Sequence, residues 1–260
     1  MSPSMDYAQL ANLYDTYANF TIDIPFFLNE ARQQGGGEIL ELMSGTGRVS
    51  LPLIEGGLKL TCVDSSPQML DILREKLAAR NLHARVVEMD VCQLELGTQY
   101  DLIFLPFNSF SELISSNDQM AALRRIQAHL APQGKFICTL HNPTIRLRQV
   151  DGQLRLWSNN PLPDGSGKLL LWGAEKYQPD QGIVNGIQLF ETYDHQGLLQ
   201  SRRMTEIRFA VIEKEAFEHM AGQAGFSASA LYGDYAYTNF SPALSPYMIY
   251  ILKHQEGGKD

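Results

Sequence analysis

An apolar, β-prone run that ends in an acidic residue and breaks into a glycine-containing loop constrains this chain more than any other feature. Residues 38–47 read Glu-Ile-Leu-Glu-Leu-Met-Ser-Gly-Thr-Gly, and residues 48–53 can continue as a helix. A strand, a tight turn and a helix N-terminus in that order bring backbone N–H groups and the helix dipole together at one point. The segment therefore predicts a cradle for a nucleotide.

A second acidic residue, Asp64, ends the next apolar run, residues 58–63. This spacing suits a carboxylate that accepts hydrogen bonds from both hydroxyls of a ribose. The alternative is that Asp64 only caps the helix expected to begin at Pro67.

The glycines indicate which nucleotide is bound. The dinucleotide fingerprint needs a third glycine three residues after the second, but Gly45 and Gly47 are followed by Ser50. Glu41, just before the loop, would repel a pyrophosphate. It suits a cationic ligand with an amino group, and S-adenosyl-L-methionine carries both a sulfonium and an α-ammonium group.

Four segments then show a family resemblance. Residues 41–48 (Glu-Leu-Met-Ser-Gly-Thr-Gly-Arg), 62–70 (Cys-Val-Asp-Ser-Ser-Pro-Gln-Met-Leu), 88–91 (Glu-Met-Asp-Val) and 100–104 (Tyr-Asp-Leu-Ile-Phe) resemble, in order and spacing, the class I S-adenosylmethionine-dependent methyltransferases. The resemblance covers roughly the first 140 residues. One departure is Met43, which occupies the position of the family's first glycine.

The resemblance implies S-adenosyl-L-methionine as cofactor and a set of residues that bind it. Generic turn glycines, a surface-turn Asp90 and a core Met69 are the structural alternatives for members of this set. The implied cofactor-binding residues are Tyr14, Glu41, Met43, Gly45, Gly47, Arg48, Asp64, Ser65, Met69, Asp90, Val91 and Phe107.

The methyl acceptor is expected near residues 105–113. This segment is similar to the Asn-Ser-Phe segment of small-molecule N-methyltransferases of the glycine and amino-sugar kinds. We take Asn108, Glu112, His141 and Tyr14 as candidate catalytic or positioning residues. Each has a structural alternative: Asn108 could cap a turn, and Glu112 could be a solvated helix residue. His141 could be a structural histidine, and Tyr14 could serve helix packing.

Strand and helix signals alternate along the chain, which predicts a Rossmann-like α/β fold with a seven-stranded, mostly parallel sheet covered by helices on both faces. The N-terminal helices and the core are expected over 1–145. Turn-broken β runs predict an inserted antiparallel β lid over 146–212, and a last helix and two strands over 213–260 complete the core sheet. Strands are expected near 38–42, 59–63, 84–88, 100–105, 134–140, 227–232 and 247–252, with helices within 7–31 and near 47–55, 67–80, 117–131 and 213–224.

The lid is rich in aromatic residues, which predicts a wall around a small acceptor. The alternatives are that these side chains form the core of the small sheet or a dimer contact. The residues are Trp157, Trp172, Tyr177, Phe190 and Tyr193.

Composition excludes several classes of partner. A net charge of −8 does not favour nucleic acid, and no apolar run approaches the roughly 20 residues that span a bilayer. Cys62, Cys92 and Cys138 are expected to be reduced core residues, and no cluster has metal-ligand spacing. We expect a cytoplasmic monomer or homodimer that acts on a small molecule without a metal.

The predicted reaction is in-line methyl transfer, more readily to an amine nitrogen than to oxygen or carbon, because the sequence offers no dedicated base. A non-catalytic S-adenosylmethionine-binding regulatory module, a nicotinamide dehydrogenase and a macromolecular methyltransferase are the competing readings.

Overall fold

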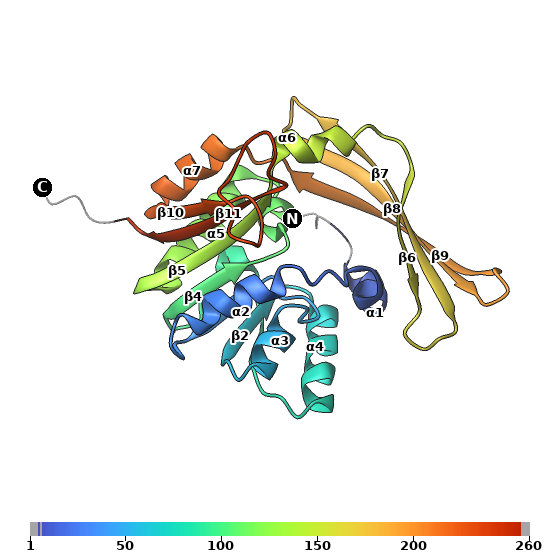
Figure 1. Cartoon of the computed structure of the whole chain (residues 1–260), viewed down its shortest axis with the longest axis horizontal. Coiled ribbons are helices and arrows are strands. Elements are labelled where there is room, and N and C mark those ends of the chain that lie inside the picture. The colour runs from blue at the N-terminus through green and yellow to red at the C-terminus, as the bar shows by residue number, and fades with distance from the viewer. Residues whose placement is uncertain (1–4, 6, 256–260) are drawn as a thin grey trace, which may run out of the picture.

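A computed structural model describes residue 5 and residues 7–255, and its main feature is a seven-stranded sheet with the order β10-β11-β5-β4-β1-β2-β3 (Figure 1). Strands β1 to β5 run parallel to one another, and β11 is antiparallel to both of its neighbours, β5 and β10. The strands are β1 (Ile39–Leu42), β2 (Leu60–Asp64), β3 (Arg85–Glu88), β4 (Tyr100–Leu105), β5 (Leu130–His141), β10 (Phe226–Tyr232) and β11 (Tyr247–His254). The predicted Rossmann-like, mostly parallel sheet is confirmed.

Helices cover both faces of this sheet because its central strands are apolar on both sides. In β4, Leu102 and Phe104 pack toward one face, while Ile103 and Leu105 pack toward the other. The first face is covered by α2 (Ile24–Arg32), α3 (Ser50–Glu55) and α4 (Pro67–Ala79), and the second by α5 (Ser116–His129) and α7 (Lys214–Gln223).

Polar caps set where the helices after the strands begin. The Ser66 hydroxyl accepts a hydrogen bond from the Met69 N–H at the start of α4, and Pro67 occupies a first-turn position where a missing N–H costs nothing. Ser115 caps α5 through the Asp118 N–H at 3.1 Å. The expected helical stretch 7–31 is two helices, α1 (Tyr7–Tyr17) and α2, because the chain turns before Pro25.

The predicted lid is a separate four-stranded antiparallel sheet. Its strands β6 (Arg155–Pro161), β7 (Gly167–Gln178), β8 (Ile183–Asp194) and β9 (Leu199–Ala210) pair in chain order. In Figure 1 this sheet extends away from the core, and α1 lies between the two. Leu10 of α1 packs on the lid side chains Leu169, Leu171 and Phe190, so α1 joins lid and core.

The three cysteines are free thiols. Cys62 and Cys138 are fully buried, Cys92 is partly buried, and burial raises the pKa of each thiol. Among the described residues, no helix has the length and apolar character needed to cross a membrane. The domain boundaries at 145/146 and 212/213 stay predictions.

Candidate active site

Two adjoining cavities open at the carboxyl ends of the parallel strands, where ligands bind in sheets of this kind. One, of about 240 Å³, lies over β1 to β4 and is called the core cavity; the other, of about 270 Å³, lies between the core and the lid and is called the lid cavity. Met5, Tyr7, Tyr14 and Glu112 line both. The two spaces therefore meet at these four residues.

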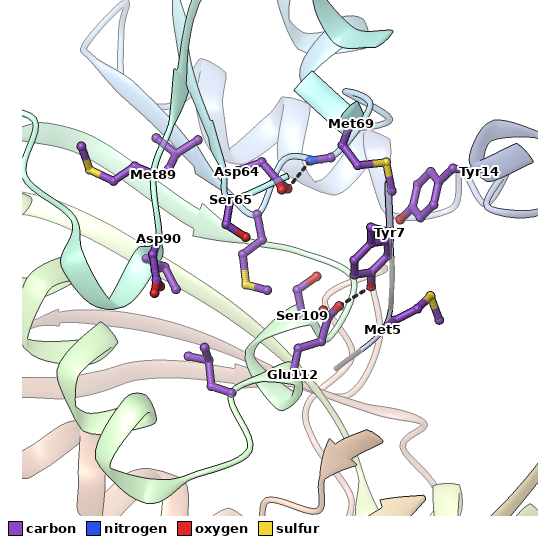
Figure 2. A pocket seen from close by; sticks show the side chains of 15 residues that line it. Met5, Tyr7, Tyr14, Asp64, Ser65, Met69, Met89, Asp90, Ser109 and Glu112 are labelled. Atoms are coloured by element: carbon purple, nitrogen blue, oxygen red, sulfur yellow. Dashed lines mark hydrogen bonds between the residues drawn. The ribbon is translucent and has the colours of Figure 1, made fainter. Parts of the chain in front are cut away.

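Of the predicted cofactor residues, most line the core cavity. They are Tyr14, Met43, Gly45, Asp64, Ser65, Met69, Asp90 and Val91. Figure 2 shows Asp64, Ser65 and Met69 on one side of the cavity and Asp90 beside Met89 on another.

The glycine loop is fixed to the end of β2 by Asp64. One Asp64 carboxylate oxygen accepts the Gly45 N–H at 2.8 Å, and the other accepts the Ser66 N–H at 2.8 Å. Burial raises the pKa of Asp64, and these backbone donors partly offset that effect. A carboxylate oxygen can accept more than one hydrogen bond, so Asp64 can also receive ribose hydroxyls from the cavity.

The loop backbone is left-handed at three positions. Gly45 and Gly47 have φ of +55° and +83°, and Met43 has φ of +53°. Met43 therefore adopts the conformation for which the family uses glycine. This conformation costs a non-glycine residue about 1–3 kcal/mol. The Met43 side chain lines the core cavity, so its thioether lies against the space for the ligand.

Apolar side chains and a second carboxylate also line the core cavity. Met69, 2% exposed, and Val91, 5% exposed, supply the apolar walls. Asp90 accepts the Cys92 N–H at 2.9 Å, which caps the short helix η1 (Val91–Gln93), and it still lines the cavity. These groups together suit a planar base with an amino group.

Three residues predicted for cofactor binding line neither cavity. Glu41 is 1% exposed and receives a hydrogen bond from the Ser50 hydroxyl, and burial raises its pKa to about 8. Gly47 packs against Leu73 of α4. The contacts of these residues are made within the protein, behind the loop, and their direct role in binding stays a prediction.

Arg48, the third of them, pairs with the buried Asp23. Its two terminal nitrogens donate to both Asp23 carboxylate oxygens at 2.7 and 2.6 Å, and one also donates to the Phe20 carbonyl at 2.6 Å. The guanidinium lies 4.8 Å from the centre of the Phe107 ring. Arg48 thus holds the start of α2 and the Phe107 loop against the glycine loop.

A tyrosine–glutamate contact lies where the cavities meet. The Tyr7 hydroxyl donates to a Glu112 carboxylate oxygen at 2.7 Å, as Figure 2 shows. Tyr14 packs edge-on against Tyr7 with ring centres 6.2 Å apart. Burial raises the pKa of both phenols, so both are neutral donors at physiological pH. The sequence reasoning missed Tyr7; its spacing of seven residues from Tyr14, two helical turns, was the available signal.

A loop with a strained backbone, after β4, lines the lid cavity. Phe107 and Asn108 both have φ of +59°, a conformation that is costly for non-glycine residues and that clusters at functional sites. The Asn108 N–H donates to the Thr139 hydroxyl at 3.0 Å, which fixes the turn before the short helix η2 (Ser109–Glu112). Both residues line the lid cavity, so Phe107 lies on the lid side of the junction.

His141, at the end of β5, also lines the lid cavity. Burial, with a smaller contribution from Arg146, lowers its pKa to about 3, so the imidazole is neutral at physiological pH. Its ring stacks on Tyr247 with centres 6.0 Å apart.

The predicted aromatic wall is wrong, because none of its five residues lines the core or lid cavity. Trp172 and Tyr193 donate to Glu191 at 3.0 and 2.8 Å, and Phe190 is buried against Tyr17. Alternate residues of a strand face opposite sides, and aromatic content does not tell which side is inward. The lid instead lines its cavity with Leu171, Glu175, Gln188, Ile207, Arg208 and Phe209.

The strand order and the cavity over the strand ends define a Rossmann-like, nucleotide-binding class of protein. Residues 39–134 match the family model described as a methyltransferase domain. The resemblance to the class I S-adenosylmethionine-dependent methyltransferases is thus confirmed over the residues that this model matches.

Two curated relatives each match just under half of the chain. A glycine/sarcosine N-methyltransferase of Halorhodospira halochloris is 31% identical over 119 residues, 45% of this chain and 44% of the relative. A cypemycin N-terminal methyltransferase of Streptomyces is 32% identical over 117 residues, 45% of this chain and 47% of the relative. The matches therefore span less than half of either relative.

Solved structures share the fold over almost the whole chain. An S-adenosylmethionine-dependent methyltransferase from Clostridium acetobutylicum superposes with a TM-score of 0.81 at 17% identity, covering 96% of this chain and 99% of that one. The CcbJ methyltransferase of Streptomyces caelestis gives 0.79 at 23% identity, covering 96% and 97%. The likeness extends through the lid, so core and lid together form a recurring architecture.

Proposed function

We propose that the protein binds S-adenosyl-L-methionine in the core cavity and transfers its methyl group to the nitrogen of a small amine in the lid cavity. The observation that carries the proposal is the junction of the two cavities at Tyr7, Tyr14 and Glu112. A donor held on one side and an acceptor held on the other can meet there in line.

The core cavity fits the cofactor. Asp64 would accept the ribose hydroxyls, Met69 and Val91 would hold the adenine, and Asp90 would receive its amino group. A Cβ built on Gly45 would meet nothing within 4 Å, so the loop leaves open space beside its backbone. The sulfonium supplies an activated methyl group, and the protein contributes alignment and exclusion of water, which can be equivalent to about 10⁵–10⁸ M of reactant.

The polar groups that line the lid cavity favour an amine. Asn108 and Glu112 supply oxygen acceptors for an N–H or an ammonium group, and a neutral amine then attacks without a base. A hydroxyl acceptor would need a base with a pKa near the working pH, but His141, at about 3, is far below it. The names of the glycine/sarcosine N-methyltransferase relatives also support nitrogen as the acceptor atom.

Calorimetry tests the cofactor assignment. We expect S-adenosylmethionine and S-adenosylhomocysteine to bind with similar affinity, because adenosine and the amino-acid tail are common to both. NAD should not bind, because the loop lacks the third glycine. Tight NAD binding with no response to S-adenosylhomocysteine would show that the proposal is wrong. Action as a monomer or homodimer in the cytoplasm stays a prediction.

A further inference from the structure

Three buried polar atoms of the lid cavity have no hydrogen-bond partner within residue 5 and residues 7–255. They are the Tyr17 hydroxyl, the Asn108 side-chain oxygen and the Gln188 side-chain oxygen. A buried polar atom without a partner costs about 1–3 kcal/mol, so native structures rarely keep several together. Their convergence on one cavity indicates that a ligand provides the missing partners.

The three atoms come from different parts of the fold. Tyr17 ends α1, Asn108 follows β4 of the core, and Gln188 belongs to β8 of the lid. Gln188 is 9% exposed and pairs across the sheet with Gly173, whose missing side chain leaves room that the ring of Trp157 fills. Gln188 is thus the lid's own uncharged acceptor in this cavity.

The charged groups of the lid cavity indicate what kind of acceptor molecule fits. Glu175 is 7% exposed and forms an ion pair with Arg146 from α6 (Pro143–Arg146). Arg208 alternates along β9 with Ile207 and Phe209, and its Nε donates to Asn185 on the neighbouring strand at 3.2 Å. Its side chain therefore lies on the opposite face of the lid from those two residues. Arg146 lies over the ring of Phe209, 5.1 Å from its centre, but its charge is paired with Glu175. Among the described residues in and beside the cavity, none therefore presents an unpaired inward cation for a carboxylate.

We infer that Gln188, which lines the lid cavity together with Asn108, is a specificity-determining residue that accepts a hydrogen bond from a second donor group of the acceptor. The inference rests on the proposed function and deepens it: the acceptor is an amine with a further hydroxyl or N–H group near its nitrogen and without a carboxylate. Leu171, Ile207 and Phe209 pack against its carbon skeleton.

Three ring amines with one skeleton test this. Cyclohexylamine, 2-aminocyclohexanol and 2-aminocyclohexanecarboxylate are titrated by calorimetry into protein saturated with S-adenosylhomocysteine, so that binding is read without turnover. We expect the amino alcohol to bind at least about tenfold more tightly than either other amine, because a site built to bond a hydroxyl rejects analogues that lack it.

Variants locate the effect. Gln188→Leu keeps a side chain of similar volume and removes the acceptor, so its preference for the amino alcohol over cyclohexylamine should fall to within about threefold. Gln188→Glu keeps an acceptor oxygen and should retain the preference. The matched control is Gln200→Leu on β9, where the exposed amide donates to Asp194 at 2.6 Å, outside both cavities; it should behave as wild type.

The outcomes separate the two proposals. An unchanged preference in Gln188→Leu, or tightest binding of the carboxylate amine, overturns the inference while the cofactor assignment stands. If S-adenosylhomocysteine does not bind, the proposed function is wrong, and the same three amines are titrated into the unloaded protein. Should Gln188→Leu not fold, Gln188→Met replaces it, with the same expected loss of preference.

Discussion

Replacing Asp64 by alanine should weaken cofactor binding while the protein stays folded. The carboxylate accepts the Gly45 and Ser66 N–H groups at 2.8 Å each and lines the core cavity. Hydrogen bonds to a charged group contribute about 1.5–3 kcal/mol each, but the freed N–H groups at the open cavity can be hydrated in the mutant. We therefore expect a loss of about 1–3 kcal/mol in the free energy of unfolding.

Cofactor binding is weakened as well, because the ribose acceptor and the position of the Gly45 loop are lost together. A loss of at least ~2 kcal/mol corresponds to an increase in Kd of about 30-fold. The assay is calorimetric titration of S-adenosylhomocysteine, with denaturant unfolding of each variant alongside it. Asp71→Ala on α4, where the exposed carboxylate pairs with Arg74, is the control and should leave Kd unchanged. A Kd for Asp64→Ala within threefold of wild type would refute the ribose assignment.

Three further predictions concern the loop and the groups behind it. Arg48→Met should lower the free energy of unfolding by about 3–5 kcal/mol, because it leaves the fully buried Asp23 charge unpaired. The control Arg80→Met, in an exposed ion pair, should lower it by less than about 1 kcal/mol. Equal losses in the two variants would contradict this prediction. The free energy of unfolding of Met43→Gly should lie within about 1 kcal/mol of the wild-type value. That of Met43→Val should be lower by about 1–3 kcal/mol in denaturant melts, because a β-branched residue tolerates positive φ poorly. Equal stability of these variants would argue against a strained loop. Burial raises the pKa of Glu41 from 4.5 to about 8, so between these pH values the folded protein retains a proton that the unfolded chain releases. Relative to Glu41→Gln, wild type should therefore lose stability as pH rises from about 5 to 8, by at most ~1.4 kcal/mol per pH unit. Parallel curves of stability against pH for the two proteins would refute the assignment.

The core of the fold follows from patterns within the sequence. The run Leu102–Leu105 is apolar at every position, as a strand buried on both faces must be, and the structure places it in β4. The turn residues Pro179–Gly182 fall between β7 and β8 of the lid, as their composition indicates. Element ends were less accurate: β5 begins at Leu130, four residues before the predicted start, because the helix before it ends at His129.

The acceptor side of the site could not be predicted in this way. Phe107 and Asn108 are left-handed, and the Asn108 N–H donates to the Thr139 hydroxyl, which is far away in the chain. Gln188 is an ordinary polar residue in a strand, and only its neighbours in three dimensions leave its oxygen without a partner. Residues such as Asp64 were recognisable because local spacing alone fixes their position at the end of a strand.

The central claim is methyl transfer to a small amine, and the direct measurement is mass spectrometry of the acceptor after incubation with S-adenosylmethionine carrying a deuterated methyl group. A panel of small amines, alcohols and carboxylates is offered together with the intact protein. We predict that the labelled methyl group appears on nitrogen in at least one amine, with release of an equal amount of S-adenosylhomocysteine. Labelling of hydroxyl compounds alone, or no labelled product from a protein that binds S-adenosylmethionine tightly, would contradict the account.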